Sequence, residues 1–356
     1  MKITTKSLLA TAAALVLAGV ALTACSSGSS AGSSDSSGAK IGLLLPETTT
    51  ARYESKDKPY FEEALKKDCP SCQFLYANAS SDASKQQQQA QSMLTQGVKV
   101  LVVDPYDGKA AGSIVAAAAA QNVPVVAYDR LISHPKLTYV ISNDYEKVGE
   151  IQAQTLVDKL KKGGVPSGSG IIMINGATTD NNALNIAKGA HKIIDNSGYK
   201  VLSHYETWDP AEAQNYASSM ITKYGDQIKA VYSANDGNAE AAISAMKAAG
   251  MKVVPTTGLD ASLAGLQSII AGEQYMTVYN SFRGEATEAA KVAVELAQGK
   301  KPASTATVNG IPATLQQPVG VTLDNIKSTV IKDGLYTTDE ICTAQYADAC
   351  KAAGIN

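Results

Sequence analysis

The chain has 356 residues, of which 45% are hydrophobic and only 18% charged, and its formal net charge is -2. This balance excludes the basic surface typical of nucleic-acid binding and the acidic tail that attracts cationic partners. The length is large for a single hydrophobic core and is typical of two lobes.

The N-terminus predicts an exported protein with a lipid anchor. Lys2 and Lys6 form a short positive region, and the apolar run Ser7–Leu22 is too short to span a membrane comfortably. Small residues and Cys25 follow, in a pattern that resembles the bacterial lipobox. The resemblance implies a signal peptide over residues 1–24, a lipid on Cys25 and a position on the outer face of the cell membrane.

A Ser/Gly-rich segment separates the predicted anchor from the folded body. Residues 26–39 are nearly all Ser, Gly and Ala, so they cannot bury enough apolar surface to form a core. We expect residues 25–39, the lipidated cysteine included, to act as a flexible tether. The folded body then begins near Lys40.

The cysteines predict two local disulfides. There are five cysteines, and a lipid on one of them accounts for the odd number. The others form two close pairs, Cys69 with Cys72 and Cys342 with Cys350, which in an exported chain favour disulfides. A redox motif or half of a zinc site is the alternative for the first pair, but a redox pair usually opens a helix, and this one follows the helical stretch 59–67.

From Lys40 onward, β-rich runs alternate with amphipathic stretches. Most of the runs are continuously apolar, which is typical of parallel strands covered on both faces. The alternation predicts an α/β fold with doubly wound parallel sheets. The expected strands are 41–45, 73–76, 100–103, 125–128, 171–174, 200–205, 230–233 and 252–255. The expected helices are 84–96, 109–121, 147–161, 182–196, 211–224, 239–249 and 263–271.

An internal repeat predicts that the two lobes are alike. Residues 99–129 and 229–260 each read strand, Asp-Gly turn, Ala-rich helix, strand and a final aspartate. Asp107 of the first copy matches Asp236 of the second. Ligands of such sheets bind beyond the carboxyl ends of the strands, and all of these aspartates lie there. The polar residues expected at an interlobe cleft are therefore Asp129, Arg130, Asp180, Asn181, Asn182, Asn235, Asp236 and Asp260.

The sequence lacks the motifs of common enzyme sites. It contains no G-x-S-x-G elbow, no phosphate-binding G-x-x-x-x-G-K-[ST] loop and no H-E-x-x-H, and its three histidines are scattered. We therefore expect no catalytic residue, no metal and no cofactor. The expected chemistry is recognition of a neutral ligand, because carboxylates and carboxamides can bond adjacent hydroxyl groups. Trp208, the single tryptophan, either stacks on such a ligand or fills core space.

Several blocks of sequence resemble the periplasmic sugar-binding proteins of ABC importers, of the ribose, galactose and xylose type, and most of all the xylose-binding proteins. The similarity covers roughly residues 40–336. The blocks are Ala127–Arg130, Ser142–Gly149, Asp180–Ala183, Ser233–Asp236, Gly258–Gly265, Met276–Tyr279 and Ile331–Gly334.

The resemblance implies the residues that hold a sugar. Arg52 and Tyr53 fall where the family places an arginine and an aromatic ring, and Trp208 matches its second stacking ring. Asn280 stands where xylose binders usually carry a lysine, which leaves a sugar site but weakens the claim for xylose over another pentose or hexose. The other implied ligand-binding residues are Asp129, Arg130, Asp180, Asn182, Asn235 and Asp260.

The resemblance also implies a periplasmic binding protein of type I, with two lobes joined by a three-segment hinge. Crossings are expected near 142–143, 279–280 and 311–319. The N-terminal lobe would comprise 40–142 plus 281–311, and the C-terminal lobe 143–280 plus 312–356. The implied partners are a monosaccharide and the membrane subunits of an ABC permease, with the binding protein itself a monomer.

Two other functions remain open from sequence. A sugar sensor that presents its closed form to a signalling receptor would use similar residues. An extracellular carbohydrate-active enzyme would need an acid/base pair, for which Asp236 and Asp260 are the candidates.

Overall fold

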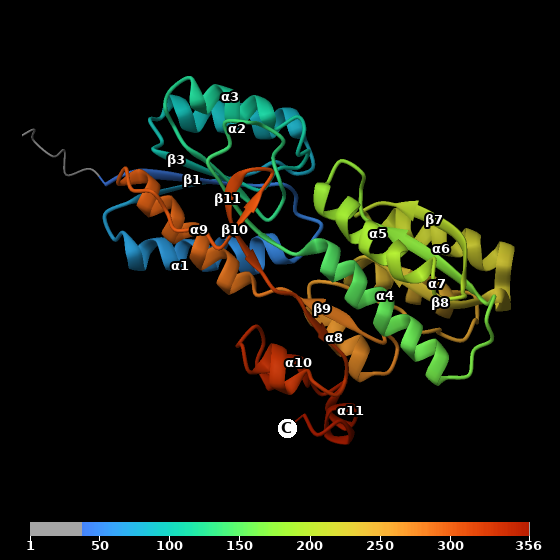
Figure 1. Cartoon of the computed structure of the whole chain (residues 1–356). Helices are drawn as coiled ribbons and strands as arrows, with labels where there is room; N and C mark the ends of the chain where they lie inside the picture. The colour runs from blue at the N-terminus through green and yellow to red at the C-terminus, as the bar shows by residue number, and fades with distance from the viewer. Residues whose placement is uncertain (1–37, 356) are drawn as a thin grey trace, which may run out of the picture. The chain divides into compact units, whose positions relative to one another are not determined.

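The computed structural model describes residues 38–355, which build a seven-stranded and a three-stranded β-sheet covered by helices, together with a separate two-stranded sheet (Figure 1). The predicted signal peptide, Cys25 and nearly all of the predicted tether lie outside the described residues. Within the described part of the chain, no helix has the length and apolarity needed to cross a membrane.

The first sheet has seven strands in the order β10-β11-β5-β4-β3-β1-β2. All neighbours are parallel except β10 and β11, which form an antiparallel pair at one edge. The strands are β1 (Lys40–Leu45), β2 (Gln73–Asn78), β3 (Val100–Val103), β4 (Val125–Tyr128), β5 (Tyr139–Asn143), β10 (Ala306–Val308) and β11 (Ile311–Gln316).

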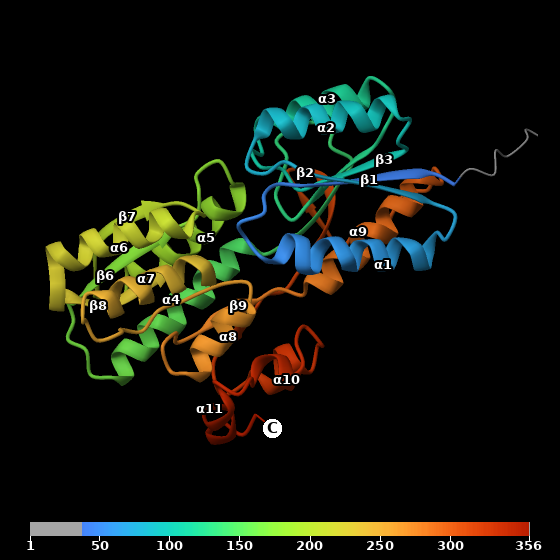
Figure 2. The same cartoon turned by 180° about the vertical axis from the view of Figure 1, so that it is seen from behind.

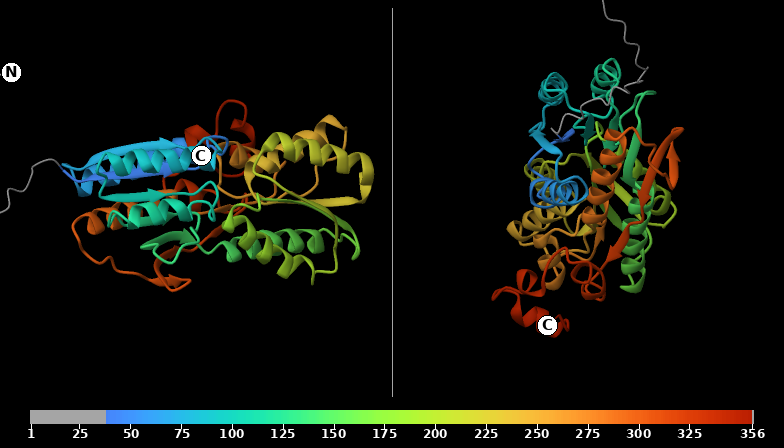
Figure 3. Two further views of the ribbon diagram at one scale, coloured as in Figure 1. Left: turned by 90° about the horizontal axis from the view of Figure 1, so that it is seen from above. Right: turned by 90° about the vertical axis from the view of Figure 1, so that its left-hand side faces the viewer.

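Helices cover both faces of this sheet, which explains its continuously apolar strands. Successive residues of β1 pack against helices on opposite faces of the sheet. Leu43 packs with Phe61 and α9 on one face, while Leu44 packs with Met93 and Ile114 on the other. Figure 2 shows α1 and α9 side by side below the sheet, and the view from above in Figure 3 shows α2 and α3 over its other face. These helices are α1 (Lys58–Asp68), α9 (Phe282–Ala297), α2 (Ala83–Thr95) and α3 (Gly112–Ala119).

The second sheet repeats this plan with three strands in the order β7-β6-β8, all parallel. Met173 of its central strand packs against α4 and α5, and Ile174 packs against α6 and α7. The elements are β6 (Gly170–Asn175), β7 (Lys200–Glu206), β8 (Ile228–Ser233), α4 (Tyr145–Lys162), α5 (Asn181–Ile194), α6 (Pro210–Tyr224) and α7 (Asp236–Ala248).

One expected strand is wrong. Residues 252–255 form no strand, and the sheet continues only through the isolated bridges Val231–Thr256 and Leu259–Val278. Pro255 has no N–H to donate to a ladder, although its carbonyl accepts a bond from the Val231 N–H at 3.0 Å. Beyond these bridges lie the antiparallel pair β9 (Thr277–Tyr279) and β12 (Val319–Val321) and helix α8 (Leu263–Ile270).

The chain passes between the two sheets three times. The passages run from β5 to α4, from β9 to α9 and from β11 to β12. Strand β11 pairs with β5 of the first sheet through Gln316, so the first sheet extends past residue 311, where the expected lobe boundary lay.

The repeat seen in the sequence corresponds to matching geometry. The Asp129 N–H bonds to the Ile141 carbonyl at 2.8 Å, and the Asp260 N–H bonds to the Val278 carbonyl at 2.9 Å. Both aspartates have positive φ, 60° and 93°. Two residues after each of these carbonyls comes a buried asparagine, Asn143 in the first repeat and Asn280 in the second. Each of them lies where the chain passes between the two sheets. The two repeats therefore present equivalent aspartates at the carboxyl ends of their strands.

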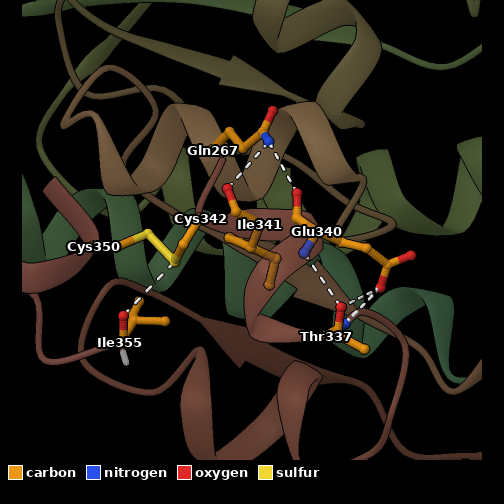
Figure 4. Close-up of a disulfide and its surroundings, with 7 residues drawn as sticks. All are labelled: Gln267, Thr337, Glu340, Ile341, Cys342, Cys350 and Ile355. Carbon is orange, nitrogen blue, oxygen red and sulfur yellow. Dashed lines mark hydrogen bonds between the residues drawn. A yellow bond between two sulfur atoms is a disulfide. The ribbon is translucent and has the colours of Figure 1, made fainter. Parts of the chain in front are cut away.

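The C-terminal segment after β12 packs against α8 (Figure 4). Ile341, Cys350 and Ile355 are buried in one apolar cluster with Leu266. The Gln267 amide donates to the carbonyls of Glu340 and Ile341 at 3.4 and 3.2 Å. The segment contains the π-helix η3 (Lys327–Ile331) and the short helices α10 (Thr338–Ile341) and α11 (Ala347–Ala352).

Both predicted cysteine pairs lie at disulfide distance. The sulfur atoms of Cys69 and Cys72 are 2.05 Å apart, and those of Cys342 and Cys350 are 2.06 Å apart. The first pair follows the end of α1, as the sequence indicates. Among the described residues, no group of three His, Cys, Asp or Glu side chains is placed to hold a metal ion.

Candidate functional site

A cavity at the carboxyl ends of the strands, here called the inner cavity, gathers nine of the ten ligand-binding residues expected from the sequence. It contains about 340 Å³ of atom-free space, its open side included. Both halves of the repeat contribute to it, since Asp129 and Asp260 both line it. Its lining residues are Thr50, Arg52, Tyr53, Asp129, Arg130, Tyr145, Asp180, Asn182, Ile186, Trp208, Asn235, Leu259 and Asp260.

Arg52 is the cationic centre of the inner cavity. Its buried guanidinium donates to both carboxylate oxygens of Asp57, at 2.9 and 2.8 Å, and lies 3.3 Å from Glu285. It is 3.4 Å from Asp129 and 4.0 Å from Asp260, and stacks on the Phe282 ring at 4.2 Å. Burial opposes its charge, but these carboxylates outweigh burial and keep its pKa well above the usual value. Arg52 therefore stays charged and links the equivalent aspartates of the two repeats.

Asp129 is held by three partners. The Tyr145 hydroxyl and the Asn182 amide both donate to its Oδ1, the latter at 3.2 Å, and the Ser142 hydroxyl donates to its carbonyl at 2.6 Å. An aspartate with positive φ is uncommon, and these bonds compensate for that backbone conformation. The carboxylate is therefore fixed in place before any ligand arrives.

Arg130 and Asp180 form a second ion pair in the inner cavity. The Arg130 Nε lies 3.1 Å from Asp180 Oδ2, and its Nη2 donates to the Tyr53 hydroxyl at 2.9 Å. The Trp208 indole N–H donates to the same Asp180 oxygen at 3.1 Å. An added Cβ on Gly176 would lie 2.1 Å from the indole, so only glycine leaves room for the ring there. This chain of bonds orients Trp208 along the cavity.

Two of the site residues are also helix caps. The Asp180 side chain accepts from the Asn182 N–H at 2.8 Å at the start of α5, and the Asn235 side chain accepts from the Asn238 N–H at 2.9 Å at the start of α7. Such capping fixes a polar side chain at the end of a strand. This explains why these residues stand where the chain turns from β6 into α5 and from β8 into α7.

Asn280 does not line the inner cavity, unlike the other nine expected residues. It lies where the chain leaves β9 for α9, 1% exposed, and neither polar atom of its amide has a hydrogen-bond partner among the described residues. Its counterpart in the first repeat is Asn143, whose Oδ1 is also unpartnered.

Four lining residues were missed by the sequence analysis as ligand-binding residues: Thr50, Tyr145, Ile186 and Leu259. Tyr145 and Leu259 lie inside two of the sequence blocks that resemble the sugar-binding proteins. The resemblance implied no ligand-binding role for these two side chains. Thr50 and Ile186 have ordinary residue types in a loop and on a helix. Only the packing of distant elements reveals that they face the cavity.

Asp236, expected at the cleft from the sequence, is bonded to residues on either side of α8. Its carboxylate accepts from the Ser262 N–H and the Gln274 amide, both at 2.7 Å, and its side chain is 1% exposed. It does not line the inner cavity. Its role is therefore to hold the segment that leads from Asp260 into α8.

The buried carboxyls predict that the ligand-free protein is more stable in mild acid. Burial raises the pKa of both Asp236 and Asp260 to about 7. Between an unfolded pKa of about 4 and a folded pKa of about 7, the folded state binds more protons, so the free energy of unfolding falls as pH rises. We expect a higher melting temperature at pH about 5 than at pH about 8, and a weaker pH dependence for Asp236→Asn. Identical pH profiles for the two proteins in thermal denaturation would contradict this assignment.

The geometry suits recognition of a polyhydroxylated neutral molecule. Two arginines, three aspartates and two asparagines present fixed donors and acceptors around one small space, and an indole borders it. Adjacent hydroxyls bond well to such paired groups, and an aromatic face covers the C–H face of a sugar ring.

Comparisons with known proteins agree with this fold. Residues 41–301 match the model of the periplasmic binding protein domain. The chain is 35% identical over 313 residues to the D-xylose-binding periplasmic protein of Escherichia coli, covering 85% of this chain and 92% of that protein. It is 27% identical over 329 residues to a xylitol-binding protein of Mycolicibacterium smegmatis, covering 92% and 90% of the two chains.

A solved structure supports the same assignment. The carbohydrate transporter solute-binding protein of Chloroflexus aurantiacus, in complex with D-glucose, superposes with a TM-score of 0.77 at 29% identity. The match covers 84% of this chain and 97% of that one. The chain therefore belongs to the periplasmic binding proteins, with the type I fold of the family's sugar-binding members.

Proposed function

We propose that the chain captures a monosaccharide outside the cytoplasm, D-xylose or a related pentose or hexose, and delivers it to an ABC permease. The observation that carries the proposal is the inner cavity, where Arg52, Asp129, Asp180 and Asp260 converge beside Trp208. The relative from E. coli, whose name states that it binds D-xylose, supports the choice of sugar.

The bonds within the inner cavity suggest how a sugar would be held. Asp129 and Asp260 would accept hydrogen bonds from hydroxyls, while Arg52 and Arg130 would donate to hydroxyl or ring oxygens. Hydrogen bonds to charged groups contribute about 1.5–3 kcal/mol each, so a few of them suffice for tight binding. Trp208 would cover one face of the sugar ring.

Lobe closure would be the transport signal. Arg52 comes from the first lobe and Asp260 from the second, and the two are 4.0 Å apart. A sugar that bonds to both would favour the closed arrangement, which the permease subunits would recognise. We propose the lobes as 40–142 plus 281–316 and 143–280 plus 317–356, with the last boundary drawn from the pairing of β11 with β5.

We further propose that the protein acts as a non-catalytic monomer. The acid/base pair that an enzyme would need is poorly supported, because both oxygens of Asp236 are engaged by Ser262 and Gln274. The two cysteine pairs would be oxidised in an exported protein, closing short loops next to α1 and in the C-terminal segment.

A titration with sugar tests the proposal through Trp208, the single tryptophan. Because its indole borders the inner cavity and is bonded to Asp180, a bound sugar should change its fluorescence intensity or emission maximum. The change should saturate with a stoichiometry of one sugar per chain. A fluorescence signal that stays constant while calorimetry records binding would show that the sugar binds away from Trp208.

We propose that a lipid on Cys25 holds the protein at the outer face of the membrane, with the Ser/Gly segment as tether. We expect Cys25→Ala to abolish labelling by a radioactive fatty acid and to release the protein from the membrane fraction. Sugar affinity should not change, because the inner cavity begins at Thr50. Unchanged lipid labelling in Cys25→Ala would contradict the assignment.

A further inference from the structure

The C-terminal segment, residues 322–355, contacts both halves of the molecule. On one side, Ile341 and Ile355 are buried in a cluster with residues of α8, which follows the second sheet in the chain. On the other side, Leu335 and Tyr336 meet η1 (Tyr53–Asp57), the π-helix that precedes α1 on the first sheet. The segment is therefore placed to hold the two halves together.

Lys56 makes the polar contact between η1 and the segment. Its ammonium donates to the Leu335 carbonyl at 2.8 Å and lies 4.1 Å from the centre of the Tyr336 ring. Burial lowers the pKa of Lys56, and the charge of Glu340 in the same segment opposes this effect. Charged hydrogen bonds and cation–π contacts are stronger where the groups are partly shielded from water. Three groups of the segment therefore stabilise one ammonium.

An apolar contact lies beside this polar one. Tyr60 of α1 packs against the apolar cluster that contains Leu335 and Ile341. The Arg283 guanidinium lies 4.1 Å from the centre of the same tyrosine ring. The contact of the segment with η1 and α1 therefore has a charged part and an apolar part.

The segment also bonds to one of the passages between the sheets. The Asp333 carboxylate accepts from the hydroxyls of Tyr279 and Ser281, the latter at 3.1 Å. These two residues flank Asn280, where the chain leaves β9 for α9. None of the side chains that make these contacts lines the inner cavity. The segment is therefore connected to a crossing and to both halves, yet lies outside the proposed sugar site.

We infer that the C-terminal segment is a latch, which stabilises the closed arrangement of the lobes through Lys56 and Tyr336 without touching the sugar. The inference rests on the proposed function, in which a sugar leaves only after the lobes separate. Separation would move Lys56 away from Leu335 and Tyr336 and break their contacts. The latch therefore sets how long a sugar stays bound, and not which sugar is bound.

The dissociation rate of a radiolabelled sugar from the full protein, chased with an excess of the unlabelled sugar, tests the inference. The probes are the two sugars that calorimetry shows to bind most tightly among D-xylose, D-ribose, L-arabinose, D-galactose and D-glucose. Lys56→Met keeps the stem of the side chain and removes its charge. We expect it to raise the dissociation rate by about tenfold, a difference of about 1.4 kcal/mol, and by the same factor for both sugars.

Lys58→Met is the matched control. The Lys58 ammonium lies 4.2 Å from the centre of the Tyr76 ring and 3.6 Å from the Glu54 carboxylate. It therefore makes a cation–π contact of the same kind, but within the first lobe only. The dissociation rate of Lys58→Met should stay within about twofold of the unaltered protein.

A second latch variant, Tyr336→Leu, distinguishes one shared contact from two separate effects. Tyr336→Leu alone should also speed dissociation, and adding Lys56→Met to it should then change the rate less than Lys56→Met does alone. An unchanged dissociation rate in Lys56→Met overturns the inference and leaves the proposed function intact. Unequal factors for the two sugars would place Lys56 in sugar recognition and overturn it too. Failure of all five sugars to bind overturns both.

Discussion

Asp260→Ala is expected to lower sugar affinity by about tenfold to a hundredfold, because it removes one or more bonds of about 1.5–3 kcal/mol from the inner cavity. The carboxylate lies 4.0 Å from Arg52 and lines the inner cavity. The stability of the ligand-free protein should change little or rise, since burial raises the pKa of this carboxyl to about 7 and so disfavours its charge. Calorimetry for affinity and thermal denaturation for stability separate the two effects.

Asp107→Ala is the matched control for this variant. Asp107 also lies beyond the end of a strand in the repeat, but its carboxylate caps the turn before α3, accepting from the N–H groups of Lys109 and Ala110 at 2.9 and 2.8 Å. It does not line the inner cavity. We expect it to lose about 1 kcal/mol of stability and no sugar affinity. Equal sugar affinities for the two variants would show that Asp260 lies outside the binding site.

Arg52→Met is expected to destabilise the protein by about 3–5 kcal/mol, because it leaves buried carboxylates without their counter-charge. Asp57 and Glu285 both have 0% exposure and both bond to this guanidinium. Burial and the neighbouring carboxylates raise the pKa of Glu285 well above its usual value even with Arg52 present. The loss of stability should therefore be greater at high pH, where these carboxyls ionise, and should be measured by urea denaturation at several pH values.

Arg283→Met provides the comparison on the same lobe. Its guanidinium lies 3.1 Å from Glu63, with about half of the arginine side chain exposed. Surface ion pairs of this kind contribute about 0–1 kcal/mol. If Arg52→Met destabilised the protein no more than Arg283→Met, the buried network around Arg52 would not support the fold.

Much of the fold was predictable because its strands are buried on both faces. Runs such as Ile41–Leu45 and Val100–Val103 are continuously apolar, and the structure has strands at both places. The short strands β9, β10 and β12 have no such run, and each has only three residues. Their pairing depends on partners far away in the chain, which local patterns do not reveal.

The site residues were predictable where a capping or charged residue comes after the end of a strand. Asp129 and Asp260 directly follow β4 and the Leu259–Val278 bridge. Asp180 and Asn235 cap the helices that come after β6 and β8, so the topology brings all four together. Asn280 follows β9 in the same way, yet its short side chain stays buried at the crossing. Whether a side chain reaches a cavity depends on the packing around it, which the position along the chain does not determine.

Isothermal titration calorimetry of the purified protein against D-xylose, D-ribose, L-arabinose, D-galactose and D-glucose tests the central claim most directly. The inner cavity, with its arginines, aspartates and single indole, predicts saturable binding of at least one of these sugars at one site per chain, lost or strongly weakened in Asp260→Ala. Absence of binding for every sugar, in a protein shown to be folded by thermal denaturation, would contradict it.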